Sequence, residues 1–196
     1  MQTQTDYKAI VIGGSAGSYA VVSRMLSALP ADFALPIIIC MHRQKHVRAG
    51  FVETLDERSP LRVVEPRDKQ AVERGFVYVA PANYHLFVEF DGTLSLSVED
   101  EHLFCRPAID YTLESAARTW RNRCVGIILT GANKDGAEGL KAIADRGGKT
   151  IVQDPQTADV PTMPRAALSL VKPDAVLSPQ GIIDFLKSIA GCSTRS

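Results

Sequence analysis

Three residues of the types that can together perform nucleophilic catalysis occur in this 196-residue sequence. Ser15 lies in GGSAG, a G-x-S-x-G pattern whose glycines let the chain turn sharply and leave the serine hydroxyl exposed. A serine nucleophile needs a histidine base and a carboxylate that orients the imidazole. His42 follows the apolar run PIIIC directly, and Asp135 follows GIILTGANK. These three residues are therefore the candidates for a Ser-His-Asp triad.

The glycine-rich loop has other interpretations. In a dinucleotide-binding domain the first strand leads into G-x-G-x-x-G and the second ends in an acidic residue. Here the position two beyond Gly13 is Ser15, and the second apolar run ends in Cys40-Met41-His42, so both features are missing. No Gly-Lys-Ser/Thr follows the loop, which excludes a P-loop. A tight strand-helix turn with Ser15 as helix N-cap stays open, as does Asp135 as N-cap of the next helix.

The elements that must position these residues alternate in type. The expected strands are residues 9–12, 36–40, 76–79, 125–129 and 150–152, with weaker candidates at 61–64 and 175–177. The expected helices are residues 19–29, 47–57, 109–121, 137–146, 165–170 and 182–189. This alternation predicts an α/β fold with a doubly wound, mostly parallel sheet, and the fully apolar strands indicate helices on both faces. Carboxyl ends of parallel strands meet at one edge, so the three candidate residues can converge there.

One section departs from this alternation. Asp91-Gly92 stands between two strand-like runs and predicts an antiparallel β-hairpin near residues 85–98. The sequence has no internal repeat, low-complexity tract or linker. We therefore expect a single domain over residues 1–196, with a core of about residues 8–190.

Composition excludes several classes of protein. Lys+Arg and Asp+Glu both number 22, so the balance of charge indicates neither a nucleic-acid partner nor an anionic membrane surface. No apolar run approaches the length of about 20 residues that spans a bilayer, and the first residues lack a signal-peptide pattern. The cysteines form no C-x-x-C pair, which indicates reduced thiols and a cytoplasmic location; they are Cys40, Cys105, Cys124 and Cys192. The remaining histidines fit solvated or core positions better than a catalytic role; they are His46, His85 and His102.

Several longer blocks carry a resemblance to a known family. They are IGGSAGS, CMH, VYVAPANYHLFVE, CRPAIDYTLESAA, GIILTGANKDGAEGL and QDPQTADVPTMPRAAL, and they extend from near residue 8 to near residue 185. With the chain order Ser, His, Asp, the sequence resembles the catalytic domain of the bacterial chemotaxis protein-glutamate methylesterases (CheB type), whereas α/β-hydrolases run Ser, Asp, His. The resemblance implies a cytoplasmic serine hydrolase that cleaves glutamate γ-methyl esters on chemoreceptors and also deamidates receptor glutamines, without a metal or organic cofactor.

The resemblance also implies residue roles. Ser15 would be the nucleophile, His42 the general base and Asp135 the carboxylate that holds the imidazole. Backbone N–H groups near Ala16 and in the loop around Ala132 are the expected oxyanion donors. The family loop has Thr and Gly where this chain has Ala16 and Ser18, and L-T-G-M-G-x-D-G where it has LTGANKDG. Because backbone donors tolerate side-chain changes, we expect these departures to alter rate or substrate fit.

The sequence is less specific about which residues contact the substrate and about how activity is controlled. Arg43, Lys45 and Arg48 follow His42, and Arg106 precedes Pro107, so a basic rim for acidic receptor helices is expected, with solvated loop charges as the alternative. About seven residues precede the first strand, so we expect no receiver domain in this sequence. Control by a separate regulatory protein is one expectation, and a domain cut from a longer protein is the alternative. The alternative function is a non-catalytic receptor-docking or scaffold relative of the same fold, which binds receptor helices without turnover.

Overall fold

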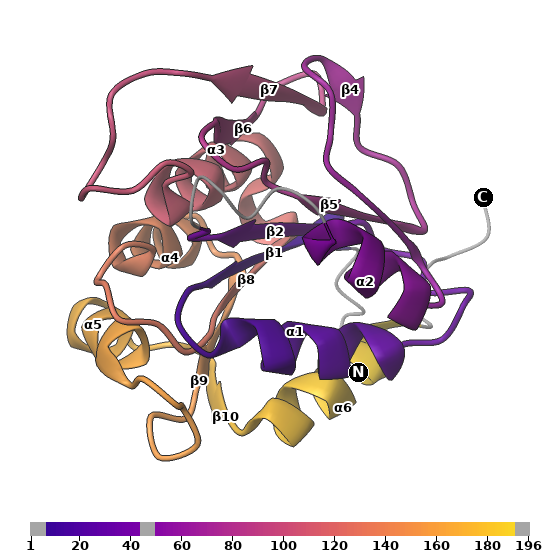
Figure 1. Cartoon of the computed structure of the whole chain (residues 1–196). Helices are drawn as coiled ribbons and strands as arrows, with labels where there is room; N and C mark the ends of the chain where they lie inside the picture. The colour runs from indigo at the N-terminus through magenta and orange to yellow at the C-terminus, as the bar shows by residue number, and fades with distance from the viewer. Residues whose placement is uncertain (1–6, 44–49, 191–196) are drawn as a thin grey trace.

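The computed structural model describes residues 7–43 and 50–190, apart from the Ala190 side chain. A seven-stranded sheet forms the centre, and every pairing in it is parallel (Figure 1). Its strands are β1 (Ala9–Gly14), β2 (Ile37–Met41), β3 (Arg62–Val64), β5 (Phe76–Val79), β8 (Cys124–Ile128), β9 (Lys149–Gln153) and β10 (Ala175–Leu177). They lie in the order β10-β9-β8-β1-β2-β5-β3. The predicted parallel sheet is confirmed.

Helices cover both faces of this sheet. They are α1 (Ser18–Ser27), α2 (Phe51–Arg58), α3 (Ile109–Trp120), α4 (Ala137–Asp145), α5 (Thr162–Leu170) and α6 (Pro179–Ala190), and a 3₁₀ turn, η1 (Arg121–Arg123), follows α3. Helices α1, α2 and α6 share one buried cluster, and α3, α4 and α5 share the other (Figure 1). None of the helices in the described ranges is both long and apolar enough to cross a bilayer.

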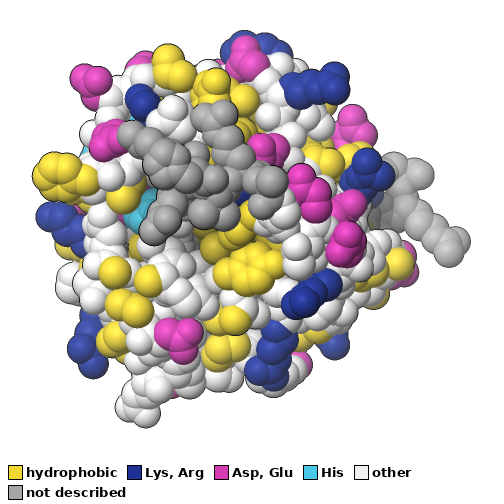
Figure 2. Space-filling view, in the orientation of Figure 1, with side chains coloured by type: hydrophobic (Ala, Val, Ile, Leu, Met, Phe, Trp, Pro, Cys, Tyr) yellow, Lys and Arg dark blue, Asp and Glu magenta, His cyan; other side chains and the backbone are white. Residues whose placement is uncertain are grey.

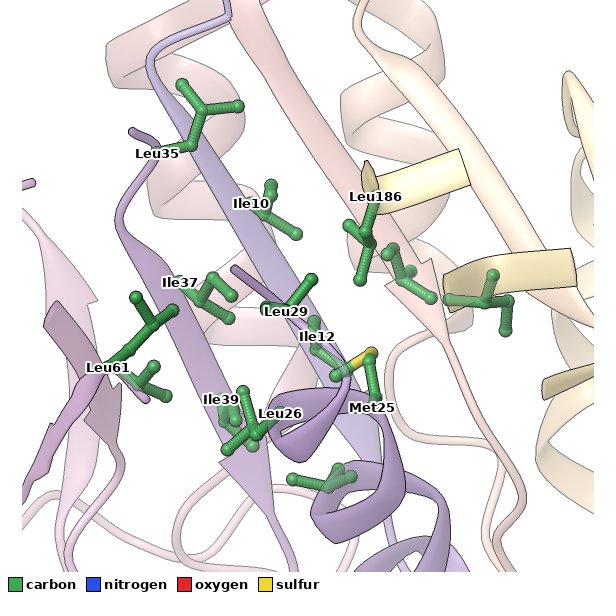
Figure 3. Packing of buried hydrophobic residues seen from close by; sticks show 14 of the residues in the cluster. Ile10, Ile12, Met25, Leu26, Leu29, Leu35, Ile37, Ile39, Leu61 and Leu186 are labelled. Carbon is green, nitrogen blue, oxygen red and sulfur yellow. The ribbon is translucent and has the colours of Figure 1, made fainter. Parts of the chain in front are cut away.

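The apolar strands are explained by the two covered faces. Successive side chains of a strand point to opposite faces. In β1, Ile10 and Ile12 pack in the cluster under α1, whereas Val11 packs in the cluster under α3. Figure 3 shows the first cluster, where Met25 and Leu26 of α1 meet the isoleucines of β1 and β2. A strand buried on both faces has no position at which a polar residue is favoured.

A smaller antiparallel sheet packs against α3. Its strands are β4 (Gln70–Ala71), β6 (His85–Val88) and β7 (Thr93–Ser97), in the order β4-β7-β6. The predicted hairpin is confirmed, and Gly92 takes the left-handed conformation of its turn at φ 83°. The two sheets are joined through α3, since Thr112 donates to the Leu86 carbonyl at 2.8 Å and Ser115 accepts the Val88 N–H at 3.0 Å.

Each helix boundary lies within a few residues of its prediction, and the differences at the N-terminal ends are largest for α2, α5 and α6. Residues 47–49 of the helix predicted at 47–57 lie outside the described residues, and α2 begins at Phe51 and ends at Arg58. Helix α5 begins at Thr162 instead of 165, and α6 at Pro179 instead of 182. Both start in a proline-containing turn, which a first helical turn tolerates because its N–H groups have no partner within the helix.

The strand order reverses at β1, which pairs with β2 on one side and β8 on the other. All three strands are parallel, so their carboxyl ends lie at the same edge of the sheet. Ser15 follows β1, His42 follows β2, and Thr130 lies two residues beyond β8. The fold thus brings the predicted loops to one edge.

Candidate active site

Ser15 sits in the connection between β1 and α1. Its N–H donates to the Thr130 carbonyl at 3.0 Å, which fixes the loop against the end of β8. A Cβ at Gly14 would lie 2.6 Å from Ser18 Cβ, and Gly17 has φ 80°, so both glycines are required by this sharp turn. Gly17 is the N-cap residue of α1, so the alternative that Ser15 caps this helix is wrong.

Ser18 is the other serine of this loop, and its hydroxyl is hydrogen-bonded within the protein. It is fully buried, and its hydroxyl donates to the Ser15 carbonyl at 2.6 Å. Ser15 is partly exposed and lines a cavity of about 310 Å³. Of these two serines, Ser15 is therefore the one whose side chain is accessible from the cavity.

Asp135 is completely buried and accepts three hydrogen bonds. The N–H groups of Ile109 and Asp110, the first two residues of α3, donate to its carboxylate at 2.7 and 2.9 Å. His42 Nε2 lies 2.7 Å from the same carboxylate. Burial would raise the pKa of Asp135, but the hydrogen bonds from His42 and the two amides lower it below its usual value, so the carboxylate is ionised. Gly136 is the N-cap of α4, so the alternative that Asp135 caps that helix is wrong.

His42 is oriented by this carboxylate. An ionised carboxylate only accepts hydrogen bonds, so Nε2 carries a proton, and in the neutral ring Nδ1 is the unprotonated nitrogen, which faces Cys105. Burial lowers the pKa of His42, but the hydrogen bonds with Asp135 and Cys105 outweigh it and raise that pKa to about 9. Nδ1 lies 3.5 Å from Cys105 Sγ. Among the described residues no hydrogen bond joins Ser15 to His42, although both line the same cavity.

The expected oxyanion donors are free in this structure. Within the described part of the chain, the N–H groups of Ala16 and Ala132 donate to no acceptor, and both residues are exposed. The Ser15 carbonyl accepts both the N–H and the hydroxyl of Ser18, and a trans peptide directs the Ala16 N–H the opposite way. Gly131 lies so close that a Cβ there would be 3.0 Å from Ser15 Cβ. The Ala132 loop therefore borders Ser15.

Two arginines of the predicted basic rim, Arg43 and Arg106, lie among the described residues. Both line the cavity, but their guanidinium groups contact other groups of the protein. Arg43 pairs with Glu65, and its guanidinium carbon lies 4.6 Å from the Phe51 ring centroid. Arg106 donates to the carbonyls of residues 98 and 99 and to Asn83. Lys45 and Arg48 lie outside the described residues. Figure 2 shows basic and acidic side chains scattered together over the face that it displays. Substrate binding by Arg43 and Arg106 stays a prediction.

Sequence reasoning missed several residues that build the site. Thr130 is buried, and its hydroxyl lies 3.0 Å from the Ala16 carbonyl and accepts the Val160 N–H. Asp110 lies behind Asp135 and accepts the N–H groups of Gly136 and Gly139 at 2.8 Å each. Burial raises the pKa of Asp110 to about 6, and the charge of Asp135 adds to this rise. For both Thr130 and Asp110, the only signal in the sequence was a polar residue within an apolar stretch.

The other described histidines lie outside the reacting centre. His85 is fully buried, accepts the Ala108 N–H and contacts the Asp100 carbonyl, so it is satisfied in the core as expected. His102 contacts Asp110 at 3.3 Å. His46 lies outside the described residues. Two clusters in the described ranges have metal-ligand types close together, namely His42 with Cys105 and Asp135, and His102 with Asp110 and Asp135.

The glycines at the end of β1 are packed against the protein. A Cβ at Gly13 would lie 2.3 Å from Ile109 Cγ2, so α3 covers the backbone at this position. Gly13 is therefore required by the packing of α3 against β1, and Gly14 by the turn before α1.

Comparisons with known proteins agree with this arrangement. The family model described as CheB methylesterase matches residues 10–186. A protein of Leptospira interrogans, provisionally named a protein-glutamate methylesterase/protein-glutamine glutaminase, is 41% identical over 180 residues, which cover 92% of this chain and 93% of that protein. The protein-glutamate methylesterase/protein-glutamine glutaminase 2 of Cupriavidus metallidurans is 36% identical over 193 residues, covering 98% of this chain and 57% of that protein. The crystal structure of the Thermotoga maritima CheB methylesterase catalytic domain matches with a TM-score of 0.88 at 32% identity, covering 93% of this chain and 98% of that chain.

Proposed function

The chain belongs to the CheB methylesterase family, and on this premise we propose that it hydrolyses glutamate γ-methyl esters on chemoreceptors through Ser15, His42 and Asp135. The names of its relatives favour a hydrolase over the non-catalytic docking alternative. The same names support deamidation of glutamine as a second reaction of the same site.

The observation that carries this proposal is the orientation of His42. Asp135 is held by two amides of α3 and in turn fixes the Nε2–H of His42. This leaves Nδ1 as the basic nitrogen, and His42 and Ser15 line the same cavity. Catalytic hydrogen bonds are often long before substrate binds, so the missing contact between Ser15 and His42 is compatible with this role.

In the first half of the reaction, Ser15 Oγ attacks the ester carbonyl carbon while His42 Nδ1 takes the hydroxyl proton. The tetrahedral intermediate places its negative oxygen toward the N–H groups of Ala16 and Ala132. The imidazolium then protonates the departing oxygen, and methanol leaves an acyl-enzyme on Ser15. Asp135 stabilises the imidazolium throughout, because its carboxylate stays ionised.

In the second half, a water molecule replaces methanol. His42 Nδ1 takes a proton from the water as its oxygen attacks the acyl carbon, and the proton passes to Ser15 Oγ as the ester bond breaks. The product is a glutamate side chain. A glutamine side chain follows the same steps with ammonia as the leaving group.

The substrate approaches over a rim that is partly apolar. Phe104 lines the cavity and is 94% exposed, so it offers a large contact surface to a partner. Arg43 and Arg106 contribute positive charge beneath this rim, which favours an acidic receptor helix. Chemoreceptor methylation helices are the proposed partner, and the cytoplasm is the proposed compartment.

Release of methanol from a methylated chemoreceptor fragment tests this function. Ser15→Ala should reduce release by at least about 10³-fold, because the covalent route is lost. Ser18→Ala is the matched control, since it removes a buried hydroxyl of the same loop while the Ser18 N–H still holds the Ser15 carbonyl. Ser18→Ala should keep most of the activity. Receptor binding without methanol release by the unmodified chain would favour the docking module instead.

A further inference from the structure

A cysteine thiol lies against the catalytic face of His42. Cys105 Sγ is 3.5 Å from His42 Nδ1, and Asn133 Nδ2 lies 3.4 Å from the same sulfur. The backbone of Cys105 is fixed by two hydrogen bonds with His102, at 2.9 and 3.1 Å. The sulfur therefore has a fixed position in the lining of the cavity, and it takes no part in the proposed reaction.

The separation of these two atoms suits a tetrahedral metal ion. Zinc binds thiolate sulfur at about 2.3 Å and imidazole nitrogen at about 2.0–2.1 Å, so a tetrahedral angle places the two ligand atoms about 3.5–3.6 Å apart. The observed 3.5 Å falls in this range. A zinc ion would thus fit between Cys105 Sγ and His42 Nδ1 with little movement of either side chain.

The surroundings of His42 match those of a metal-ligating histidine. Such a histidine almost always donates its second ring N–H to a carboxylate, which fixes the tautomer that leaves the ligating nitrogen bare. Asp135 accepts that hydrogen bond here at 2.7 Å. Two coordination positions would face the cavity, where Ser15 and Glu101 lie and water can enter.

We propose that Cys105 and His42 form a zinc-binding site that inhibits the enzyme by occupying the basic nitrogen. Binding displaces the thiol proton of Cys105 and, when the imidazole is protonated, the Nδ1 proton of His42; these protons pass to the buffer, and nothing is oxidised or reduced. Because the protein supplies only two ligands and the cavity is open, zinc binding is reversible, and a chelator removes the ion. The inhibition rests on the proposed function, whereas metal binding does not.

Cobalt(II) is the first probe, because a thiolate ligand gives it a charge-transfer absorption that zinc abolishes by competition. Ser15→Ala should show this absorption like the unmodified chain, although it cannot turn over substrate. Cys105→Ala should lack it. His102→Gln is the control for the neighbouring metal-ligand cluster and should keep it. An absent absorption in the unmodified chain, or an equal one in Cys105→Ala, would overturn the site.

Methanol release with zinc chloride alone, followed by excess chelator, tests the inhibitory effect. Each variant is compared with its own metal-free rate, and circular dichroism checks that it is folded. Cys105→Ala should need at least about tenfold more zinc for half inhibition, whereas Cys105→His, which keeps a zinc ligand, should stay sensitive. Cobalt binding through the thiolate without any loss of methanol release would overturn the inhibitory role. Absence of methanol release in metal-free buffer would count against the proposed function and leave the cobalt result standing.

Discussion

Replacing Asp135 by Asn should change both the rate and the pH dependence of ester hydrolysis. The Asp135 carboxylate accepts three hydrogen bonds, from His42 and from the N–H groups of Ile109 and Asp110. Asparagine keeps one acceptor oxygen but loses the charge, and its amide group can meet Nε2 as a donor. His42 then loses both its counter-charge and the tautomer that leaves Nδ1 basic.

The size of the effect follows from the pKa of His42. Its rise from 6.5 to about 9 corresponds to roughly 3 kcal/mol in favour of the imidazolium. Losing this stabilisation in the transition state costs about 150-fold in rate. The wrong tautomer adds to the loss, and comparable triad substitutions lower kcat by about 10⁴-fold. We therefore expect a loss of about 10³ to 10⁴-fold in the maximal rate.

The assay is methanol release as a function of pH, with chelator present. The base must be unprotonated, so kcat/KM of the unmodified chain should rise with pH and reach half its maximum near pH 9. In Asp135→Asn the hydrogen bond and the charge of Asp135 no longer act on His42, whereas burial and the contact with Cys105 remain, so the half-maximum should move to lower pH. Near neutral pH this shift hides part of the rate loss, so the plateau rates are compared.

Asp110→Asn is the matched control. It changes the neighbouring carboxylate, whose oxygen accepts the N–H groups of Gly136 and Gly139, without touching His42. Its half-maximum should stay near pH 9, with a rate within about tenfold of the unmodified chain. An Asp135→Asn profile with an unchanged midpoint, or a plateau rate within about tenfold, would refute the proposed role of Asp135.

The pH dependence of folding stability also reports the contact between His42 and Asp135. The folded-state pKa of His42 lies above the unfolded value, so its contribution is fully present below pH 6.5 and is lost as pH rises through about 9. The free energy of unfolding should therefore fall over this range by an amount of up to about 3 kcal/mol. In Asp135→Asn this decline should become smaller, because the contribution of Asp135 to the His42 pKa is lost.

Three further substitutions test neighbouring parts of the structure. Cys105→Ala removes a hydrogen bond that raises the pKa of His42, so the half-maximum of kcat/KM should move to lower pH, by less than in the triad variant; an unmoved midpoint would contradict this. Gly131→Ala places a Cβ 3.0 Å from Ser15 Cβ, so methanol release should fall by at least about tenfold, while circular dichroism stays unchanged. Leu113→Ala empties a fully buried position and should lower the free energy of unfolding in urea by about 2–5 kcal/mol, and a loss below 1 kcal/mol would contradict the packing.

The parallel sheet was predictable because its signals are local. Each apolar run marks a strand, and the carboxyl-edge rule for parallel strands then places Ser15, His42 and Asp135 together before any contact is known. The hairpin at Asp91-Gly92 was predictable for the same reason, since its turn is encoded by adjacent residues. Strand β4 was missed because two residues, Gln70 and Ala71, are too short to show a period.

The finer parts of the site depend on contacts between distant segments. The start of α3 binds Asp135 through backbone N–H groups, which the sequence does not display. Cys105 reaches His42 only because the loop before α3 folds over the end of β2. The engaged guanidinium of Arg106 is a similar case, because its partners are carbonyl groups of residues 98 and 99. Residue type alone predicted a surface charge there.

Ser15 is the proposed nucleophile, and His42 is the base that activates it. A serine-directed phosphonate should modify the intact chain once, and peptide mapping by mass spectrometry should place the adduct on Ser15. The same reagent should label His42→Ala at least about 10²-fold more slowly, because the hydroxyl has lost its base. An adduct on Ser18, or labelling of Ser15 at an equal rate in His42→Ala, would contradict the account.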